Sequence, residues 1–186
     1  LFSRYGDDGK VLLSGELERI LNKNLNDGFI LDAHIAQNEE QRLIMWERRE
    51  AAAEISLLKT PLINNDIAVP LDKVSKFLTA MEKKLPELDP DADVLIVSHL
   101  GDGNVHYTVW PSKDDEKHKD KIMEAIENVV LTLGGSFSAE HGIGLSKLSS
   151  MERRKDRVSL NVMRQIKHAI DPEGIMNPGK VLPKVH

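Results

Sequence analysis

Apolar residues follow helical spacing in some segments of the chain and extended spacing in others. Recurrence every three or four residues, with polar residues between, indicates amphipathic helices. Such helices are predicted at 12–25, from Asn38 toward Ile55, from Leu71 until Pro86 and Pro90, at 114–133 and at 151–170. Short apolar or alternating runs indicate strands. These are predicted at 29–33, 62–69, 94–97 and 105–110, with a short strand or turn at 136–138.

The order of these elements indicates the fold class. The strand at 94–97 is apolar enough to be buried, and a Gly-Asp-Gly-Asn turn at 101–104 joins it to the strand at 105–110, so an antiparallel hairpin is expected. Strands separated by helices, with at least one hairpin, predict an α+β fold in which helices cover one face of a mostly antiparallel sheet. We expect one domain over 1–186, with 86–93 as the candidate boundary between two half-units that share the sheet.

Composition narrows the class of protein. The chain has 186 residues, of which 40% are hydrophobic and 30% charged, as in ordinary soluble globular proteins. Its formal net charge of −5 argues against a nucleic-acid partner. No apolar run approaches the ~18 residues of a membrane span, and 1–10 lacks the order of a signal peptide, so the cytoplasm or the mitochondrial matrix is expected. Cysteine is absent, which leaves histidines and carboxylates for any metal chemistry.

The first chemically suggestive stretch is Ser-His-Leu-Gly-Asp-Gly-Asn-Val-His at 98–106. If the flanking strands pair, His99 ends one strand and His106 begins the next, so two imidazoles stand beside one turn. They form half of a metal site or are hydrogen-bonded turn residues. Asp102 and Asn104 are explained as turn residues that bond their own backbone, so they are not assigned to the site.

The second stretch is Glu140-His141 followed by Gly-Ile-Gly. Two histidines and one glutamate suit zinc, manganese or iron with coordination positions left open. Adjacent side chains of an extended backbone point in opposite directions, so both residues can be ligands only if the chain bends. We therefore assign His99, His106 and Glu140 to a metal and His141 to proton transfer.

These stretches, together with the tail, resemble the C-terminal part of the FAD-linked oxidases of the D-lactate, glycolate and D-2-hydroxyglutarate dehydrogenase group. That family carries His-x-Gly-Asp-Gly-Asn-x-His, then Glu-His-Gly-Ile-Gly, then Asp-Pro-x-x-x-x-Asn-Pro-Gly-Lys. The corresponding segments here are 99–106, 140–144 and 171–180. Segments 46–50 and 66–70 are also similar to the family, so the likeness covers nearly the whole chain.

The resemblance implies a ferredoxin-like cap domain set over the isoalloxazine of an FAD. In members with a metal, the residues matching His99, His106 and Glu140 hold zinc or manganese. The residue matching His141 takes the hydroxyl proton of a D-2-hydroxy acid while hydride passes to FAD N5. Arg49 would pair with the substrate carboxylate.

The resemblance also implies a missing part. The family binds FAD mainly on a Gly-rich loop of an N-terminal domain, and no such loop occurs here. The chain, which begins at Leu1, is therefore expected to be a fragment or half of a split enzyme, inactive alone. Asn177 and Lys180 would reach the flavin in the intact enzyme, although turn formation explains Asn-Pro-Gly about as well. The electron acceptor stays open, as does a homodimer.

Three positions depart from the family pattern for hydroxydicarboxylates. Those members tend to have Thr four residues after the substrate Arg, Lys fifteen after it, and Asn two after the second metal His. The present chain has Ala53, Asn64 and Thr108 at these positions. Thr108 is thus a substrate-binding candidate, and the predicted substrate is not D-2-hydroxyglutarate but a monocarboxylate or a sugar-derived acid.

Two other functions remain open on the residues alone. The same four groups would suit a free-standing metal hydrolase, in which the ion activates water and His141 shuttles protons. Alternatively, the histidines are structural and the chain is a metal-free α+β interaction module.

Overall fold

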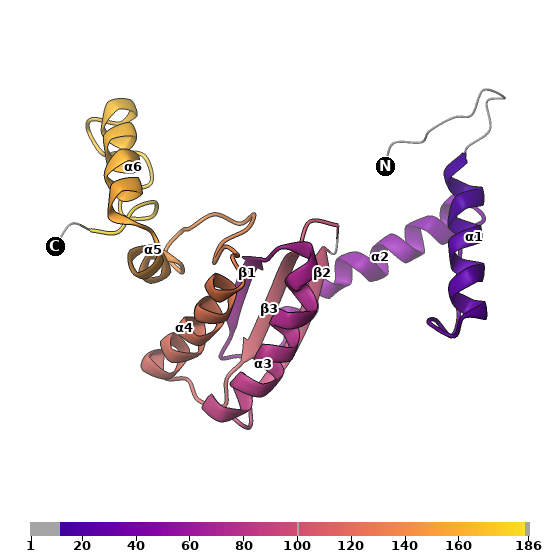
Figure 1. The fold of residues 1–186 in the computed structure, drawn as a ribbon. Helices are drawn as coiled ribbons and strands as arrows, with labels where there is room; N and C mark the ends of the chain where they lie inside the picture. The colour runs from indigo at the N-terminus through magenta and orange to yellow at the C-terminus, as the bar shows by residue number, and fades with distance from the viewer. Residues whose placement is uncertain (1–11, 100, 185–186) are drawn as a thin grey trace. The chain divides into compact units, whose positions relative to one another are not determined.

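The computed structural model describes residues 12–99 and 101–184 (Figure 1). The chain divides into two compact units, Leu1–Ala51 and Ala52–His186. The segment 86–93, the predicted boundary, lies inside the second unit. In the described part of the chain, no helix has the length and apolar character needed to cross a membrane.

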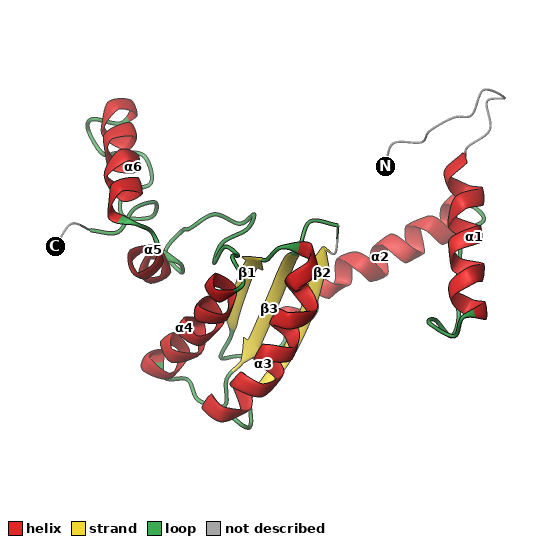
Figure 2. Ribbon diagram, in the orientation of Figure 1, coloured by secondary structure: helices red, strands yellow, loops and turns green. Residues whose placement is uncertain are grey.

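The first unit consists of helices (Figure 2). They are α1, Leu12–Asn26, and α2, Glu39–Ser56, whose last residues belong to the second unit. The predicted cap is confirmed, because the Asn38 side chain accepts the Gln41 N–H at 2.9 Å. The strand predicted at 29–33 is wrong: this segment is irregular, and Leu31 is 99% exposed. A strand needs a neighbour to satisfy its backbone, and the described residues of this unit contain no second strand.

The second unit is built on an antiparallel sheet. Its strands are β1, Ile63–Ala68, β2, Asp93–His99, and β3, Asn104–Trp110, in the spatial order β1-β3-β2. The predicted hairpin between β2 and β3 is confirmed. An isolated bridge between Ala68 and Ser136 adds a short antiparallel contact beside β1, where the predicted element at 136–138 lies.

Two helices cover one face of this sheet (Figure 1). A 3-10 turn, Leu71–Lys73, leads into α3, Val74–Leu88, and α4 is Glu116–Thr132. The order β-α-β-β-α, with the bridge beside β1, is that of a ferredoxin-like α+β fold, so the predicted fold class is confirmed. Pro86 lies inside α3, in its last turn, and does not itself end the helix, which ends two residues later at Leu88.

The core lies between the helices and the sheet. Phe77 packs edge-to-face on Tyr107 of β3, with ring centroids 5.5 Å apart. The other buried apolar residues from the helices and strands surround this pair: Ile63, Ile67, Val69, Val74, Met81, Leu85, Val105, Val109, Ile122, Ile126 and Val130. Because alternate strand residues face this core, the intervening ones face the other side of the sheet.

The strand β2 is less buried than its composition predicts. Val94 is 37% exposed and Ile96 is 44% exposed. In the described sheet, β2 is an edge strand with β3 as its one neighbour, so its side chains lie at the border of the core.

The helix predicted at 151–170 is divided in two. It forms α5, Leu148–Arg154, and α6, Arg157–Ile170. Asp156 separates them because its carboxylate caps α6, accepting the Ser159 N–H at 2.9 Å. The loop that carries Glu140 and His141 connects α4 to α5.

The turn that joins β2 to β3 depends on Gly103. Its φ of +77° is favourable only for glycine, and its carbonyl accepts the Val69 N–H at 3.1 Å. A Cβ at this position would overlap the Val69 carbonyl oxygen. The turn is therefore docked against the end of β1.

We predict that Gly103→Ala lowers the free energy of unfolding by about 1–3 kcal/mol, from left-handed strain and the overlap with Val69. Chemical denaturation of the chain measures this. The matched control is Gly101→Ala in the same turn, where a Cβ meets no atom within 4 Å. Equal stability of the two variants would contradict the explanation.

Candidate metal and catalytic site

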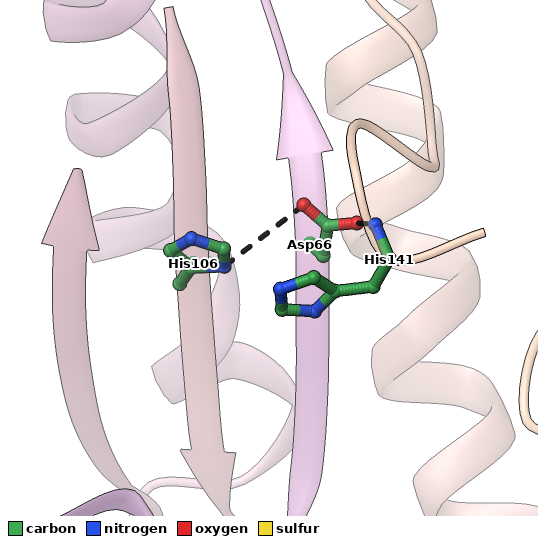
Figure 3. A group of neighbouring side chains, drawn as sticks. All are labelled: Asp66, His106 and His141. Carbon is green, nitrogen blue, oxygen red and sulfur yellow. Dashed lines mark hydrogen bonds and ion pairs between the residues drawn. The ribbon is translucent and has the colours of Figure 1, made fainter. Parts of the chain in front are cut away.

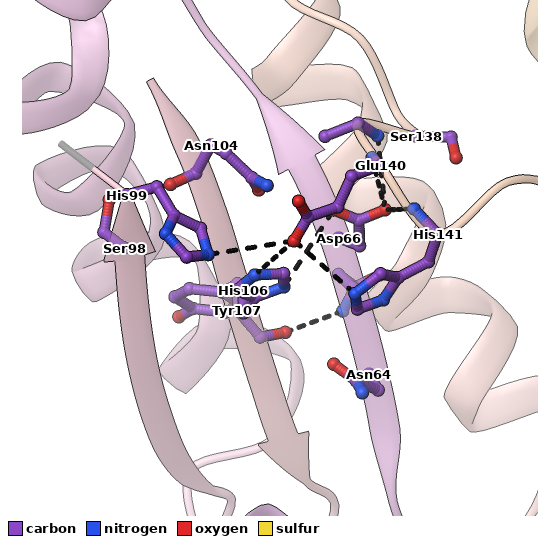
Figure 4. Close-up of polar contacts among 12 residues, drawn as sticks. Asn64, Asp66, Ser98, His99, Asn104, His106, Tyr107, Ser138, Glu140 and His141 are labelled. Atoms are coloured by element: carbon purple, nitrogen blue, oxygen red, sulfur yellow. Dashed lines mark hydrogen bonds and ion pairs between the residues drawn. The ribbon is translucent and has the colours of Figure 1, made fainter. Parts of the chain in front are cut away.

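The sheet face opposite the helices carries the polar residues. Asn64 and Asp66 of β1 and His106 and Thr108 of β3 alternate with core residues, so their side chains share this face. Figure 4 shows Asn64, Asp66 and His106 there. His99, at the end of β2, lies on the same face. Strand pairing thus brings together the two imidazoles that the sequence places seven positions apart.

The carboxylate of Glu140 lies among three imidazoles. Its Oε1 is 3.1 Å from His106 Nε2, 3.7 Å from His99 Nε2 and 3.5 Å from His141 Nε2. The His141 ring stacks on the His106 ring with centroids 5.1 Å apart, and the His99 ring meets the His106 ring edge-on at 5.3 Å. We call His99, His106, Glu140 and His141 the imidazole cluster.

The expectation that Glu140 and His141 point in opposite directions does not hold, because the chain bends between them. Figure 3 shows the cause: the backbone N–H of His141 donates to the Asp66 carboxylate. Ala139 and Glu140 donate to the same oxygen, so three successive N–H groups converge on one acceptor. Converging N–H groups require a curved backbone, which directs both side chains toward His106.

Asp66 is the residue beside the imidazole cluster that reasoning from sequence missed. Its side chain is buried. It also accepts a hydrogen bond from the Lys147 ammonium, whose Nζ lies 3.0 Å from Asp66 Oδ2. The Lys147 ammonium bonds the Ser138 hydroxyl as well, at 2.9 Å. The available signal was an acidic residue inside the strand predicted at 62–69, within the segment 66–70 that resembles the family.

The buried charges shift the pKa values of the site. Burial raises the pKa of Asp66, but the His141 N–H, Lys147 and the Glu140 N–H together hold that pKa below its usual range. Burial lowers the pKa of His106, against the opposing effect of the Asp66 carboxylate. His106 is therefore neutral at pH 7, the form in which an imidazole binds a metal.

The donor atoms suit a divalent cation. The two imidazole nitrogens of His99 and His106 and a Glu140 oxygen all lie within 4.8 Å of one another. A second triad, Asp66, His106 and His141, meets the same distance condition, with Asp66 buried. Neutral nitrogens with one carboxylate form the kind of set that holds zinc or manganese with positions left for substrate.

The other predicted site residues lie outside the imidazole cluster. Thr108 is buried on the same face, and its Oγ1 is 3.5 Å from Asn64 Oδ1. Arg49 is exposed on α2, in the first unit. Asn177, with φ of 48°, accepts the Lys180 N–H at 3.2 Å in a turn after α6. That turn explains the Asn-Pro-Gly sequence locally.

Comparison with known proteins identifies the family of the chain. The family model described as "FAD linked oxidases, C-terminal domain" matches residues 7–181. The chain belongs to this family. The match covers both units and contains every residue of the imidazole cluster.

Relatives of this FAD-linked oxidase domain are named as 2-hydroxy acid dehydrogenases. A D-2-hydroxyglutarate dehydrogenase of Stutzerimonas stutzeri is 34% identical over 164 residues, covering 84% of this chain and 35% of that protein. The mitochondrial D-2-hydroxyglutarate dehydrogenase of Rattus norvegicus is 30% identical, covering 90% and 31%. A protein of Schizosaccharomyces pombe, provisionally named a mitochondrial D-lactate dehydrogenase, is 30% identical, covering 88% and 32%. The chain spans about a third of the length of these relatives.

We predict that the His106 ring titrates below the ordinary histidine pKa of about 6.5 in the metal-free chain, because burial disfavours the imidazolium. The folded state then binds fewer protons than the unfolded state, so this residue's contribution to stability is present above about pH 6.5 and is lost as the pH falls through the lowered pKa. Ring-proton NMR shifts measure the titration. A midpoint at or above 6.5 would contradict the prediction.

Proposed function

We propose that this chain is the substrate-binding cap domain of an FAD-dependent dehydrogenase of D-2-hydroxy acids. His99, His106 and Glu140 would hold a divalent ion, zinc or manganese, and His141 would be the base. The observation that carries the proposal is the convergence of three imidazoles on Glu140 Oε1, on the sheet face that the helices leave uncovered.

Family membership supports oxidation over the alternatives. The donor set alone would serve a hydrolase equally well, since water activation needs the same ligands. The matched family is one of FAD-linked oxidases, and the relatives described above are named as dehydrogenases. FAD would be held mainly by a domain outside this chain, with Asn177 and Lys180 as this chain's candidate contacts.

Within this proposal, the bound ion would polarise the substrate hydroxyl and a carboxylate oxygen, which lowers the pKa of the alcohol. His99, His106 and Glu140 would act as its ligands and would thereby orient the substrate. Because His106 is neutral, it contributes a lone pair and adds no positive charge.

His141 would take the hydroxyl proton. Its side chain is 57% exposed, so substrate approaching the open face can reach it, and its stacking on the His106 ring holds the imidazole in place. FAD, when bound, would supply the hydride acceptor for the α-hydrogen; with the hydroxyl proton on His141, the 2-hydroxy acid would become a 2-oxo acid. Arg49 is proposed to pair with the substrate carboxylate.

The substrate is proposed to be a monocarboxylate or a sugar-derived acid. Asn64 and Thr108, which lie on the site face, carry no positive charge to pair with a second carboxylate. Ala53 is equally uncharged. We propose the cytoplasm or the mitochondrial matrix as the location; the rat and rice relatives are named mitochondrial.

We predict that the metal-free chain binds one zinc or manganese ion, measured by calorimetric titration. His106→Ala should weaken binding by at least about 100-fold. It removes a ligand, and loss of a residue that only supports a ligand already weakens metal binding by about 10–100-fold. His168→Ala, an exposed histidine in the last turn of α6, is the control and should bind normally. Absence of stoichiometric binding to the wild-type chain would contradict the metal site.

In the enzyme that contains both this domain and its FAD domain, we predict that His141→Gln lowers kcat for D-2-hydroxy acids by about 10²–10⁴-fold, as expected for loss of a general base. Turnover of a panel of hydroxy acids, followed by flavin bleaching, measures it. His34→Ala, an exposed histidine paired with Asp32, is the control. D-2-hydroxyglutarate as the best substrate would contradict the substrate proposal.

A further inference from the structure

We infer that Asp66 is the positioning residue of the site: one carboxylate oxygen holds the Glu140–His141 backbone, and the other selects the His106 tautomer whose Nε2 is free to bind a cation. The inference rests on the metal site proposed above. It assigns to a buried residue of β1, which is not itself among the proposed ligands, control over both halves of that site.

The first half of the argument concerns Asp66 Oδ2. It accepts N–H groups from Ala139, Glu140 and His141 at 3.3, 3.1 and 2.9 Å, and the Lys147 ammonium at 3.0 Å. Four donors leave this oxygen saturated and fix the orientation of the whole carboxylate. The loop has further anchors at the Ala139 N–H, which also donates to the Asp66 backbone carbonyl at 3.1 Å, and at the Ser138 hydroxyl, which donates to the Gly142 carbonyl at 2.9 Å. The N–H groups of Glu140 and His141 themselves donate to Oδ2, so this oxygen holds the backbone that carries both side chains.

The second half concerns Asp66 Oδ1, which is buried and has no hydrogen-bond partner. Residues Asp66 and His106 are directly opposite in the β1–β3 pair, and Oδ1 is 3.9 Å from His106 Nδ1 (Figure 3). The gap is too short to hold a bridging water and slightly too long for a hydrogen bond. A small rotation of the imidazole therefore satisfies the oxygen if Nδ1 carries a proton.

The opposite tautomer would place the Nδ1 lone pair against a buried carboxylate oxygen, which is repulsive. It would allow Nε2–H to donate to Glu140, 3.1 Å away. However, Glu140 is 50% exposed and can be hydrated, whereas Asp66 Oδ1 has no access to water. Leaving the buried Asp66 oxygen unsatisfied costs more free energy than leaving the hydrated Glu140 oxygen without the His106 bond. Asp66 therefore determines the tautomer.

The consequence for ligation follows directly. With the proton on Nδ1, the Nε2 lone pair and the Glu140 carboxylate face each other without a hydrogen between them. Two acceptors at this separation are an arrangement that a cation stabilises. A carboxylate that fixes a ligating histidine through its other nitrogen is a general feature of metal sites.

The test measures the tautomer without metal. Nitrogen-15 NMR of the histidine rings in the metal-free chain, at about pH 8 and so above the ordinary histidine pKa, is expected to show His106 protonated at Nδ1. In Asp66→Asn, the amide oxygen can still accept the N–H groups of 139–141 while its NH₂ faces Nδ1, so the proton should move to Nε2. Zinc affinity should fall about 10–100-fold in the same variant.

The matched control is Asp89→Asn. Asp89 is also a buried carboxylate paired with a histidine, His118, with Oδ2 to Nε2 at 2.8 Å. It lies beyond the opposite end of the sheet, where its carboxylate accepts the Ser112 N–H just after β3. This variant should leave the His106 tautomer and zinc affinity unchanged.

Protonation of wild-type His106 at Nε2 overturns the inference, and so does an Asp66→Asn variant that keeps the Nδ1 proton. Equal loss of zinc affinity in the two Asn variants also overturns it, since the effect would then be a general loss of structure. If Asp66→Asn fails to fold, the wild-type tautomer alone decides. If the wild-type chain binds no zinc, the proposed metal site fails, while the tautomer measurement still tests the role of Asp66.

Discussion

The site depends on one buried ionic contact, between the Asp66 carboxylate on one side and the Lys147 ammonium with three backbone N–H groups on the other. Removing a carboxylate from water is costly unless hydrogen bonds replace its hydration. Here the replacements come from a loop more than seventy positions away in sequence. The requirement to satisfy that charge therefore joins the sheet to the loop that carries Glu140 and His141.

This contact is possible because one face of the sheet carries apolar residues and the other carries polar ones. On one face, α3 and α4 cover an apolar core around Phe77 and Tyr107. The other face carries His106 and Asp66 between those core residues, at the alternate positions of the same strands. Rigid packing on the covered face holds the catalytic candidates on the uncovered one in register, which is the precision that a ligand set requires.

Much of the fold was predictable where a local pattern coincided with its tertiary environment. The helix at 114–133 and the hairpin of β2 and β3 follow from apolar periodicity and a glycine turn, and both are present. Predictions were wrong where contacts with neighbouring segments or side chains determine the structure. Residues 29–33 have strand composition but no partner strand among the described residues. The helical pattern at 151–170 is interrupted because Asp156 caps a new helix. Likewise, apolar content predicted burial of β2, but an edge strand has fewer neighbours to cover it.

The sequence by itself determined the chemistry of the site: with no cysteine, the histidines of the hairpin and the Glu-His pair were the donors that its motifs offered. It also determined the family, because three motifs in order are specific. Only the tertiary structure decided that Glu140 and His141 face the same way, and that Asp66 and Lys147 lie behind them. The physical reason is that both features depend on which residues satisfy the buried Asp66 charge. Those residues are distant in sequence, so the spacing of motifs along the chain does not predict them.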